Sequence, residues 1–180
     1  YYMEFDNMAG LHVKDFKHWW EKQIDTKNRT VIRKAEKAGV VVKLDDYTDE
    51  FVKGIVSIYN ESPMRQGKPF WHYGKDFDTV KRANERQIER SDFIGAYFND
   101  ELIGFIKLVY GDGARVVRTD QIISKIAYRD KKPTNALVAK AVEICASKNV
   151  PYFLYAYWPK GSLADFKRHM GFQEMRIPRY

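Results

Sequence analysis

Residues 127–136, AYRDKKPTNA, combine a run of basic side chains with the expected start of a helix. Backbone N–H groups at a helix start attract anions, and neighbouring cations strengthen that attraction. The turn contains no glycine, however, and Pro133 lacks an N–H donor, so close approach of a phosphate to the backbone is impeded. The candidates for contact with a phosphate-bearing cofactor are Arg129, Lys131, Lys132, Thr134, Asn135 and Ala136. An ordinary Pro-Thr helix start with solvated lysines is the alternative interpretation.

A long aromatic loop, residues 61–77, carries groups suited to hold a substrate or to accept a proton. Arg65, Trp71 and Tyr73 could enclose an acceptor or stack on a base. His72 is the one histidine in a site-like setting, and it could take the proton of an amine. The alternative is that the loop is an aromatic plug that seals the edge of a sheet.

Two further features are candidates for a site. Arg29, Arg33 and Lys37 are spaced i, i+4, i+8 on an expected helix and form one basic stripe. A phosphate-rich substrate or a tRNA backbone could lie along this stripe, although a charge run is more often a solvated face. Asp120, on an expected strand, is the candidate carboxylate base, with an exposed strand position as the simpler explanation. The histidines are not at metal-ligand spacing, so no metal site is expected.

The composition, 44% hydrophobic and 31% charged, is that of a globular protein. The length of 180 residues suits one domain, expected to span 1–180 with a helical segment, 1–38, packed on it. The net charge of +7 favours an anionic partner, such as a phosphorylated substrate, nucleic acid or anionic lipid. No apolar run of about 18 residues exists, so no membrane span is expected. Cys145 has no partner for an intrachain disulfide, which fits a cytoplasmic location.

The first expected element is a helix over 15–38, capped by Asp15 and closed by Gly39. The later elements are expected as a strand at 40–44, helices at 49–60 and 78–90, strands at 92–98, 101–110 and 115–128, a helix from its N-cap Thr134 to Lys148, a strand at 151–158, a helix at 162–170 and a strand at 172–177. Asn99-Asp100 is an expected hairpin turn. The order predicts an α/β fold, a mixed central sheet with helices on both faces, preceded by a long N-terminal helix.

This order of elements resembles the GNAT acyltransferase superfamily over nearly everything after residue 39. Two motifs narrow the resemblance. NRTVIRKAEKAGVVV (28–42) is similar to the basic helix-to-strand junction of Fem-type (FemABX-like) peptidyltransferases, and LADFKRHMGF (163–172) is similar to their C-terminal FK-x-x-x-G signature. Those enzymes move an amino acid from aminoacyl-tRNA onto the amine of a peptidoglycan precursor. They usually have two such domains, so the resemblance implies either a missing second GNAT-like domain or a single-domain relative.

The resemblance implies acyl or aminoacyl transfer to an amine, with aminoacyl-tRNA as the donor. An N-acetyltransferase that uses acetyl-CoA, or another acyl-CoA, is the first alternative. GNAT enzymes often place an acidic tyrosine four residues before a Gly-Phe pair, and here Lys167 stands at that position. The resemblance implies that the Lys167 ammonium assists transfer by stabilising negative charge, whereas a surface lysine is the plainer interpretation. Loss of both the glycines and the tyrosine fits a changed donor or a catalytically silent binding module.

Overall fold

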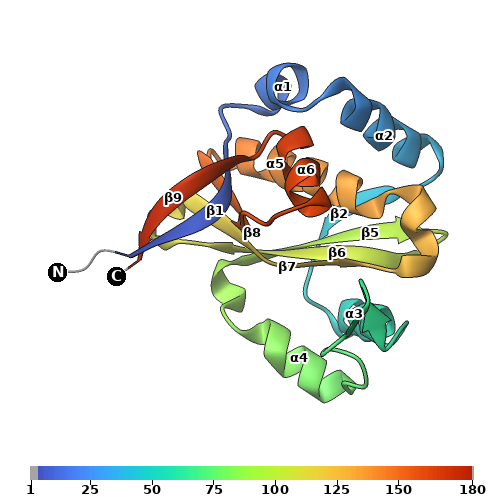
Figure 1. The fold of residues 1–180 in the computed structure, drawn as a ribbon. Coiled ribbons are helices and arrows are strands. Elements are labelled where there is room, and N and C mark those ends of the chain that lie inside the picture. The colour runs from blue at the N-terminus through green and yellow to red at the C-terminus, as the bar shows by residue number, and fades with distance from the viewer. Residues whose placement is uncertain (1–3, 180) are drawn as a thin grey trace.

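The protein, described here by a computed structural model over residues 4–179, has a sheet between two layers of helices (Figure 1). The seven strands lie in the order β2-β5-β6-β7-β8-β1-β9. Their bounds are β1 (Glu4–His12), β2 (Val41–Asp45), β5 (Ser91–Phe98), β6 (Glu101–Tyr110), β7 (Val116–Ser124), β8 (Tyr152–Tyr157) and β9 (Gln173–Arg179). All neighbouring strands are antiparallel except β7 and β8, which are parallel. The predicted mixed sheet is confirmed.

Helices cover both faces of this sheet, as predicted (Figure 1). α3 (Asp49–Tyr59) and α4 (Phe77–Glu85) lie on one face, joined by a small hairpin of β3 (Met64–Arg65) and β4 (Lys68–Pro69). The other face carries α5 (Pro133–Ser147), with α2 (Thr26–Lys37) and α6 (Ser162–His169) beside it. The central strand β6 is buried along almost its whole length because both of its faces are covered.

Several predicted local features are confirmed. Asn99 and Asp100 both have positive φ, 49° and 63°, as a two-residue type I′ hairpin turn requires. The carboxylate of Asp15 accepts a hydrogen bond from the amide of His18 at 2.7 Å, so it caps the first helical turn. Gly39, with φ of 95°, follows the end of α2 in the left-handed conformation that favours glycine.

The prediction of a long N-terminal helix is wrong in two respects. Residues 4–12 form β1, which lies inside the sheet between β8 and β9. The expected helix over 15–38 is divided into α1 (Phe16–His18), a π-helical turn η1 (Trp19–Gln23) and α2. Ile24 is extended, with ψ of 142°, and Asp25 starts a new helix by accepting from the amide of Asn28 at 2.6 Å. The N-cap at Asp25 therefore starts a new helix, although the apolar periodicity of residues 15–38 runs through this point without a break.

Three predicted element ends also differ. β7 stops at Ser124 rather than at residue 128, because the chain turns there into a 3-10 helix, η4 (Ile126–Lys131). α5 begins at Pro133, so Thr134 lies inside the helix and is not its N-cap. A proline fits the first helical position because its fixed φ is helical. α4 ends at Glu85 rather than at residue 90. Among residues 4–179, none of the helices has the length and apolar character needed to cross a membrane.

Candidate functional site

The strands β7 and β8 separate shortly after they meet. Their parallel ladder joins residues 116–118 to residues 152–154, and no later pair between them forms within residues 4–179. β8 then follows β1, where the register shifts and Ala156 takes a positive φ of 51°. β7 continues alone on this side as far as Ser124. Open α/β sheets bind ligands at the carboxyl ends of such strands, so the separation marks a candidate site.

The hollow at this separation, which we call the strand cleft, has a volume of about 530 Å³. Its walls come from β7, β8, the start of α5, α6 and the aromatic loop. It is lined by Arg65, Gln66, Phe70, Ile122, Ile123, Ser124, Arg129, Thr134, Tyr155, Leu163 and Phe166. Arg129, three hydroxyls and several apolar side chains therefore face the same space, together with the internally bound guanidinium of Arg65, which suits a ligand with an anionic part and an apolar part.

Arg129 of η4 and Thr134 in the first turn of α5 both line the strand cleft. Lys132 has a left-handed backbone, with φ of 56°, and Pro133 follows it at the first helical position. Thr134 Oγ1 lies 3.1 Å from Ser124 Oγ, so its hydroxyl is bonded to β7. The first N–H groups of a helix have no acceptor within the helix, which leaves this end of α5 electropositive in spite of the proline.

The remaining side chains predicted at this turn point elsewhere. Asn135 is buried and donates through Nδ2 to Asn28 Oδ1 at 2.8 Å, which ties α5 to α2. Ala136 is buried and lines a different hollow. Lys131 Nζ lies 4.9 Å from the ring centre of Phe98. The side chains of Asn135 and Ala136 thus serve packing, and only their backbone could face a ligand.

Arg65 is held in place at the edge of the strand cleft. Its guanidinium donates to the carbonyl oxygens of Ser124 at 2.7 Å and Ile58 at 3.0 Å, and it pairs with Glu61 at 3.1 Å. Glu61 also accepts from the first two amides of η4, at 2.6 and 2.8 Å. Burial lowers the pKa of Arg65, and the Glu61 carboxylate opposes that shift. Sequence reasoning missed Glu61 because two of its partners are backbone amides of η4, which only the fold brings next to it.

Lys167 is buried, with 2% of its surface exposed. Its ammonium donates to the carbonyl oxygens of Tyr155 at 2.5 Å and Tyr157 at 2.8 Å, in the part of β8 that has left β7. The same nitrogen lies 4.4 Å from the ring centre of Tyr155, whose side chain lines the strand cleft. Burial lowers the pKa of Lys167 to about 8. The lysine therefore satisfies carbonyl groups of the separated strand, and its connection to the cleft runs through Tyr155.

A second hollow, which we call the sheet-face pocket, lies between the sheet, α3, α4 and the aromatic loop, with a volume of about 660 Å³. It is lined by Tyr59, Trp71, His72, Ala83, Asn84, Arg86, Gln87, Arg118, Asp120 and Gln121. Gln121 of β7 lines this pocket while the next residue, Ile122, lines the strand cleft. Likewise, Trp71 of the aromatic loop lines the sheet-face pocket, whereas its neighbour Phe70 lines the strand cleft. The two hollows are therefore neighbours on either side of the aromatic loop and β7.

A β-bulge turns Asp120 into the sheet-face pocket. Lys107 of β6 pairs with Gln121 while the next residue of β6 pairs with Thr119, so Asp120 is the extra residue. The bulge lets Asp120 and Gln121 face the same side, which strict strand alternation would forbid. The Asp120 carboxylate lies 2.8 Å from the guanidinium of Arg118 and 3.6 Å from Lys107 Nζ.

Lys107, on β6, connects the sheet to the end of α4 next to this pocket. Only 1% of its surface is exposed, and its ammonium donates to the carbonyl oxygens of Asn84 at 2.9 Å and Arg86 at 2.7 Å, at the end of α4. Burial lowers the pKa of Lys107, and Asp120 acts in the opposite direction. Sequence reasoning missed this residue, although a lysine inside the apolar strand ELIGFIKLVY was a usable signal.

His72 lies in the sheet-face pocket together with Asp120, so the structure brings the two predicted proton acceptors to one hollow. The imidazole packs on Tyr59, with ring centres 4.2 Å apart, and its Nε2 lies 2.9 Å from the Gln121 amide nitrogen. Burial, helped by the Lys75 ammonium, lowers the pKa of His72 to about 4. The ring is therefore neutral at neutral pH. Within residues 4–179, no group of three or more His, Cys, Asp or Glu side chains could hold a metal ion.

The predicted substrate-binding aromatics are exposed. Trp71 lines the sheet-face pocket, yet 74% of its surface is exposed. Tyr73 is 47% exposed and is not among the residues that line either hollow. The alternative prediction, an aromatic plug at the edge of the sheet, fits Phe70, because Phe70 packs against the buried cluster under α3. It does not fit Trp71 and Tyr73.

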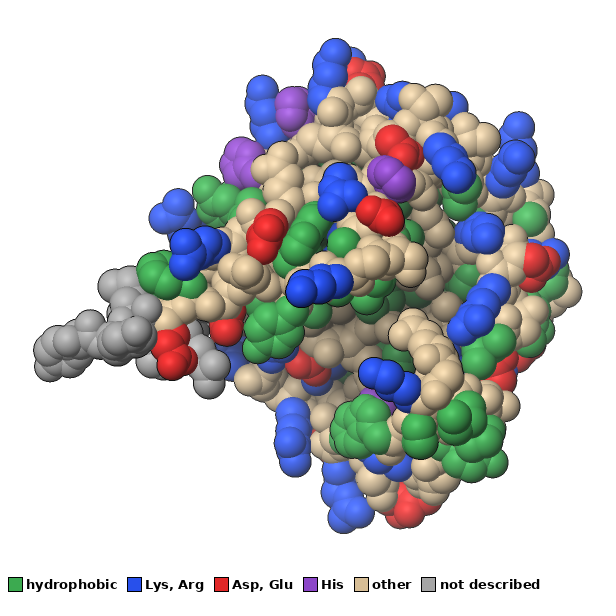
Figure 2. Space-filling view, viewed as in Figure 1, with side chains coloured by type: hydrophobic (Ala, Val, Ile, Leu, Met, Phe, Trp, Pro, Cys, Tyr) green, Lys and Arg blue, Asp and Glu red, His purple; other side chains and the backbone are tan. Residues whose placement is uncertain are grey.

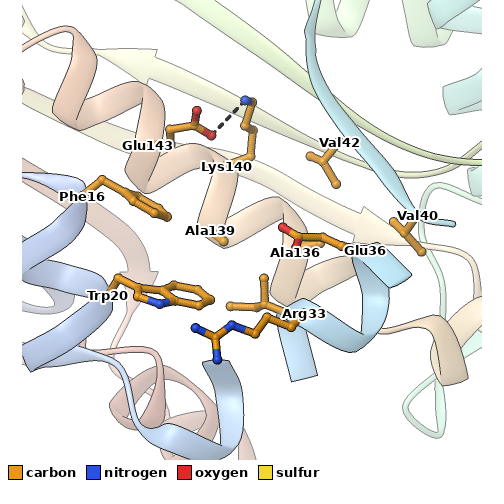
Figure 3. Close-up of a pocket in the computed structure, with 11 residues that line it drawn as sticks. Phe16, Trp20, Arg33, Glu36, Val40, Val42, Ala136, Ala139, Lys140 and Glu143 are labelled. Carbon is orange, nitrogen blue, oxygen red and sulfur yellow. Dashed lines mark hydrogen bonds and ion pairs between the residues drawn. The ribbon is translucent and has the colours of Figure 1, made fainter. Parts of the chain in front are cut away.

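The basic stripe of Arg29, Arg33 and Lys37 contributes no residue to the strand cleft or the sheet-face pocket. Arg29 is bound internally, because it donates to the carbonyl of Trp20 at 3.0 Å and to Thr26 Oγ1 at 2.8 Å. Arg33 lies 5.4 Å from the ring centre of Trp20, at the rim of a third hollow of about 280 Å³ between η1, α2 and α5 (Figure 3). Lys37 is exposed. Only Arg33 and Lys37 are thus open to an external anion.

Several solved structures share this arrangement. FemX matches with a TM-score of 0.74 and 11% identity over 93% of this chain and 59% of its own. L-PGS from Bacillus licheniformis matches with a TM-score of 0.60 and 12% identity, over 85% of this chain and 45% of its own. A ribosomal-protein-alanine N-acetyltransferase from Brucella melitensis biovar Abortus 2308 matches with a TM-score of 0.50 and 18% identity, over 72% of this chain and 86% of its own. The chain has the GNAT fold, in the form seen in FemX.

The predicted resemblance to GNAT and Fem-type enzymes is thereby confirmed at the level of the fold. No protein-family model and no curated protein sequence matches the chain. The chain spans 59% of the length of FemX and 45% of that of L-PGS. In this GNAT fold the β7-α5-β8 crossover is the unit that frames the strand cleft, and it is the same unit whose basic turn stood out in the sequence.

Proposed function

We propose that residues 1–180 form a GNAT-type transferase domain that moves an acyl or aminoacyl group onto an amine. The separation of β7 from β8 carries this proposal, since it opens the strand cleft at the carboxyl ends of two parallel strands. The fold shared with FemX and with an N-acetyltransferase supports the same reaction class. The sheet-face pocket next to the cleft gives the second substrate its own entrance.

The start of α5 favours an aminoacyl donor over acetyl-CoA. Pro133 removes one of the amides on which a pyrophosphate would rest, and Lys132 places a side chain where a glycine would leave the backbone open. The hydroxyl of Thr134 is already bonded to Ser124. What remains is the electropositive helix end with Arg129 beside it, which suits a single phosphate or a carbonyl oxygen better than a closely bound pyrophosphate. Aminoacyl-tRNA is the donor class that this proposal names.

The acceptor amine is proposed to approach from the sheet-face pocket. Its nitrogen attacks the acyl carbonyl carbon, a C–N bond forms, and the ester C–O bond to the leaving hydroxyl breaks. The amine loses one proton and the leaving oxygen gains one, so the step is balanced. The Asp120 carboxylate and the neutral His72 ring, whose pKa lies at about 4, face the pocket and are the groups that can receive the proton.

Lys167 is proposed to position the cleft wall. Its ammonium is bonded to the carbonyl oxygens of Tyr155 and Tyr157, and its side chain is not among those that line the strand cleft. It would therefore help transfer by holding β8 in place. Its positive charge would act on developing negative charge over a distance, without direct contact.

Isothermal titration calorimetry with two ligands tests the proposal. The ligands are acetyl-CoA and an aminoacyl-adenosine in which an amide replaces the labile ester. Ser124→Phe fills the strand cleft, whereas Thr30→Phe adds the same ring to the exposed surface of α2 as a control. We expect the aminoacyl analogue to bind wild type and Thr30→Phe alike, and to bind Ser124→Phe at least about tenfold more weakly.

The same titrations distinguish the alternatives. Saturable acetyl-CoA binding that Ser124→Phe abolishes, without binding of the analogue, would identify an acetyl-CoA-dependent N-acetyltransferase. If wild type binds neither ligand, the catalytically silent binding module is favoured and the proposed reaction is wrong.

A further inference from the structure

The segment between α3 and α4 exposes large apolar side chains in a concentrated group. We call residues 62–75 the docking loop. Its exposed members are Met64 at 47%, Trp71 at 74% and Tyr73 at 47%. Figure 2 shows hydrophobic side chains gathered on the lower part of the molecule, where α3 and this loop lie, with basic side chains next to them. Exposed apolar groups of this density mark interaction surfaces more often than chance exposure.

The docking loop is held firmly at its base. The side chain of Asn60 binds it twice, accepting from the amide of Gly74 at 2.7 Å and donating to the carbonyl of Lys75 at 3.2 Å. Arg65 fastens the first half of the loop to β7 and α3, as described above. Phe70 donates its amide to Pro63 at 2.8 Å and closes the β3–β4 hairpin. These bonds hold the loop in a conformation that exposes Trp71 and Tyr73.

The charges inside the docking loop are of one sign, and the two carboxylates that flank it are engaged, Glu61 with Arg65 and Asp76 with the amide of Thr79. Residues 62–75 contain Arg65, Lys68 and Lys75 and no Asp or Glu. Arg65 is consumed by internal bonds, which leaves Lys68 and Lys75, and the Lys75 ammonium also lies 3.5 Å from His72 Nδ1. Lys75 Nζ lies 3.5 Å from the ring centre of Trp71, which places a cation directly beside the most exposed aromatic side chain.

We propose that the docking loop binds the surface of an anionic lipid bilayer. Tryptophan and tyrosine are favoured at the headgroup level because their rings are apolar at one end and polar at the other. Lysine side chains can lie along the same surface and reach lipid phosphates with their ammonium groups. The overall charge of +7 adds to the attraction.

The aliphatic members of the surface favour a bilayer over single-stranded RNA. A base needs a flat ring to stack on, and Met64 offers none. Leu163, which is 43% exposed, lines the neighbouring strand cleft together with Gln66 and Phe70 of the loop. Thioether and isobutyl groups gain free energy from the acyl boundary of a membrane. The inference concerns binding alone, and it does not depend on the proposed transferase reaction.

Vesicle co-sedimentation of the full chain tests this inference. The probes are vesicles of phosphatidylcholine alone and of phosphatidylcholine mixed with phosphatidylglycerol. We expect binding to the mixed vesicles only, weakened about fivefold for each lysine in Lys68→Gln and Lys75→Gln and lost in Trp71→Ser combined with Tyr73→Ser. Brominated lipids should quench tryptophan fluorescence in wild type and much less in Trp71→Phe.

Matched changes elsewhere on the surface serve as controls. Val41→Ser with Leu44→Ser removes exposed apolar groups from β2, and Lys27→Gln with Lys37→Gln removes two cations from α2. The apolar control should bind vesicles like wild type, and the charge control should weaken binding less than the two loop lysines do. Equal binding by the loop variants and their controls overturns the proposal, as does failure of folded wild type to bind mixed vesicles. Retention of a single-stranded RNA oligonucleotide that depends on Trp71, without vesicle binding, would also overturn it in favour of an RNA surface.

Discussion

Replacement of Lys167 by methionine should change how the stability of the protein depends on pH. Methionine keeps the length and most of the apolar volume of the lysine stem but removes the ammonium that binds the carbonyl oxygens of Tyr155 and Tyr157. Burial lowers the pKa of Lys167 from its ordinary value of 10.5 to about 8. The folded protein therefore holds this proton less tightly than the unfolded chain does.

The sign and the magnitude follow from proton linkage. Between pH 8 and pH 10.5 the unfolded chain binds more protons at this residue than the folded protein, so the free energy of unfolding rises with pH in that window. Below pH 8 the full cost of charging the buried amine, about 3 kcal/mol for such a pKa difference, opposes folding. Between pH 7 and about pH 9.5 this group should raise the free energy of unfolding by about 2 kcal/mol.

Urea unfolding followed by circular dichroism at a series of pH values measures this effect. The upper limit of about pH 9.5 keeps the measurement below the titration of unfolded tyrosines. Lys167→Met should lose the rise of about 2 kcal/mol, while Lys160→Met, a change at an exposed lysine, should keep the wild-type pH dependence. If the free energy of unfolding changes with pH in the same way for wild type and Lys167→Met, the lowered pKa of a buried Lys167 amine is refuted.

Three further predictions concern the supports of the site. In NMR titrations the His72 imidazole should become protonated only as the pH falls toward about 4, and protonation near pH 6.5 would contradict its burial. Because the unfolded chain takes up this proton first, the protein should lose stability as the pH drops from 6.5 to about 4, and His72→Phe should lose less. Gly171→Ala should cost about 1–3 kcal/mol, because Gly171 has a left-handed φ of 92° and its added carbon would lie 3.2 Å from the Gln23 backbone, whereas Gly111→Ala, where the nearest atom is at 3.5 Å, should be nearly neutral in urea unfolding. Glu61→Gln should cost about 1–3 kcal/mol by turning an amide N–H toward the first amides of η4, and equal stability of this variant and wild type would show that those two bonds are unimportant.

The layers of the fold could be predicted from local patterns. The helix α3 and the β5–β6 hairpin follow from helical periodicity, strand alternation and the Asn99-Asp100 turn. The crossover β7-α5-β8 follows from the order of elements. The strand β1 could not be predicted in this way, because EFDNMAGLH lacks β-branched residues and is defined by its pairing with β8 and β9.

The candidate site shows the same limit. His72 and Asp120 were identified by their chemistry, and the fold brings them to one pocket. Lys107 and Glu61 were missed because backbone carbonyls and amides, which carry no sequence signal, are among their partners. Arg29 was assigned to a ligand-facing stripe, but the break in the helix exposes the carbonyl of Trp20 and captures its guanidinium. Sequence patterns thus indicate which side chains could take part in chemistry, but not which of them are already bound by backbone groups in the folded protein.

The central claim, that the strand cleft between β7 and β8 receives the donor, is tested most directly by a crystal structure with the amide-linked aminoacyl-adenosine bound. We predict that the aminoacyl group lies between the separated strands, beside Ser124 and Tyr155, with the nucleoside end toward Arg129 and Thr134. Occupation of the hollow beside Trp20 instead, with an empty strand cleft, would contradict the claim.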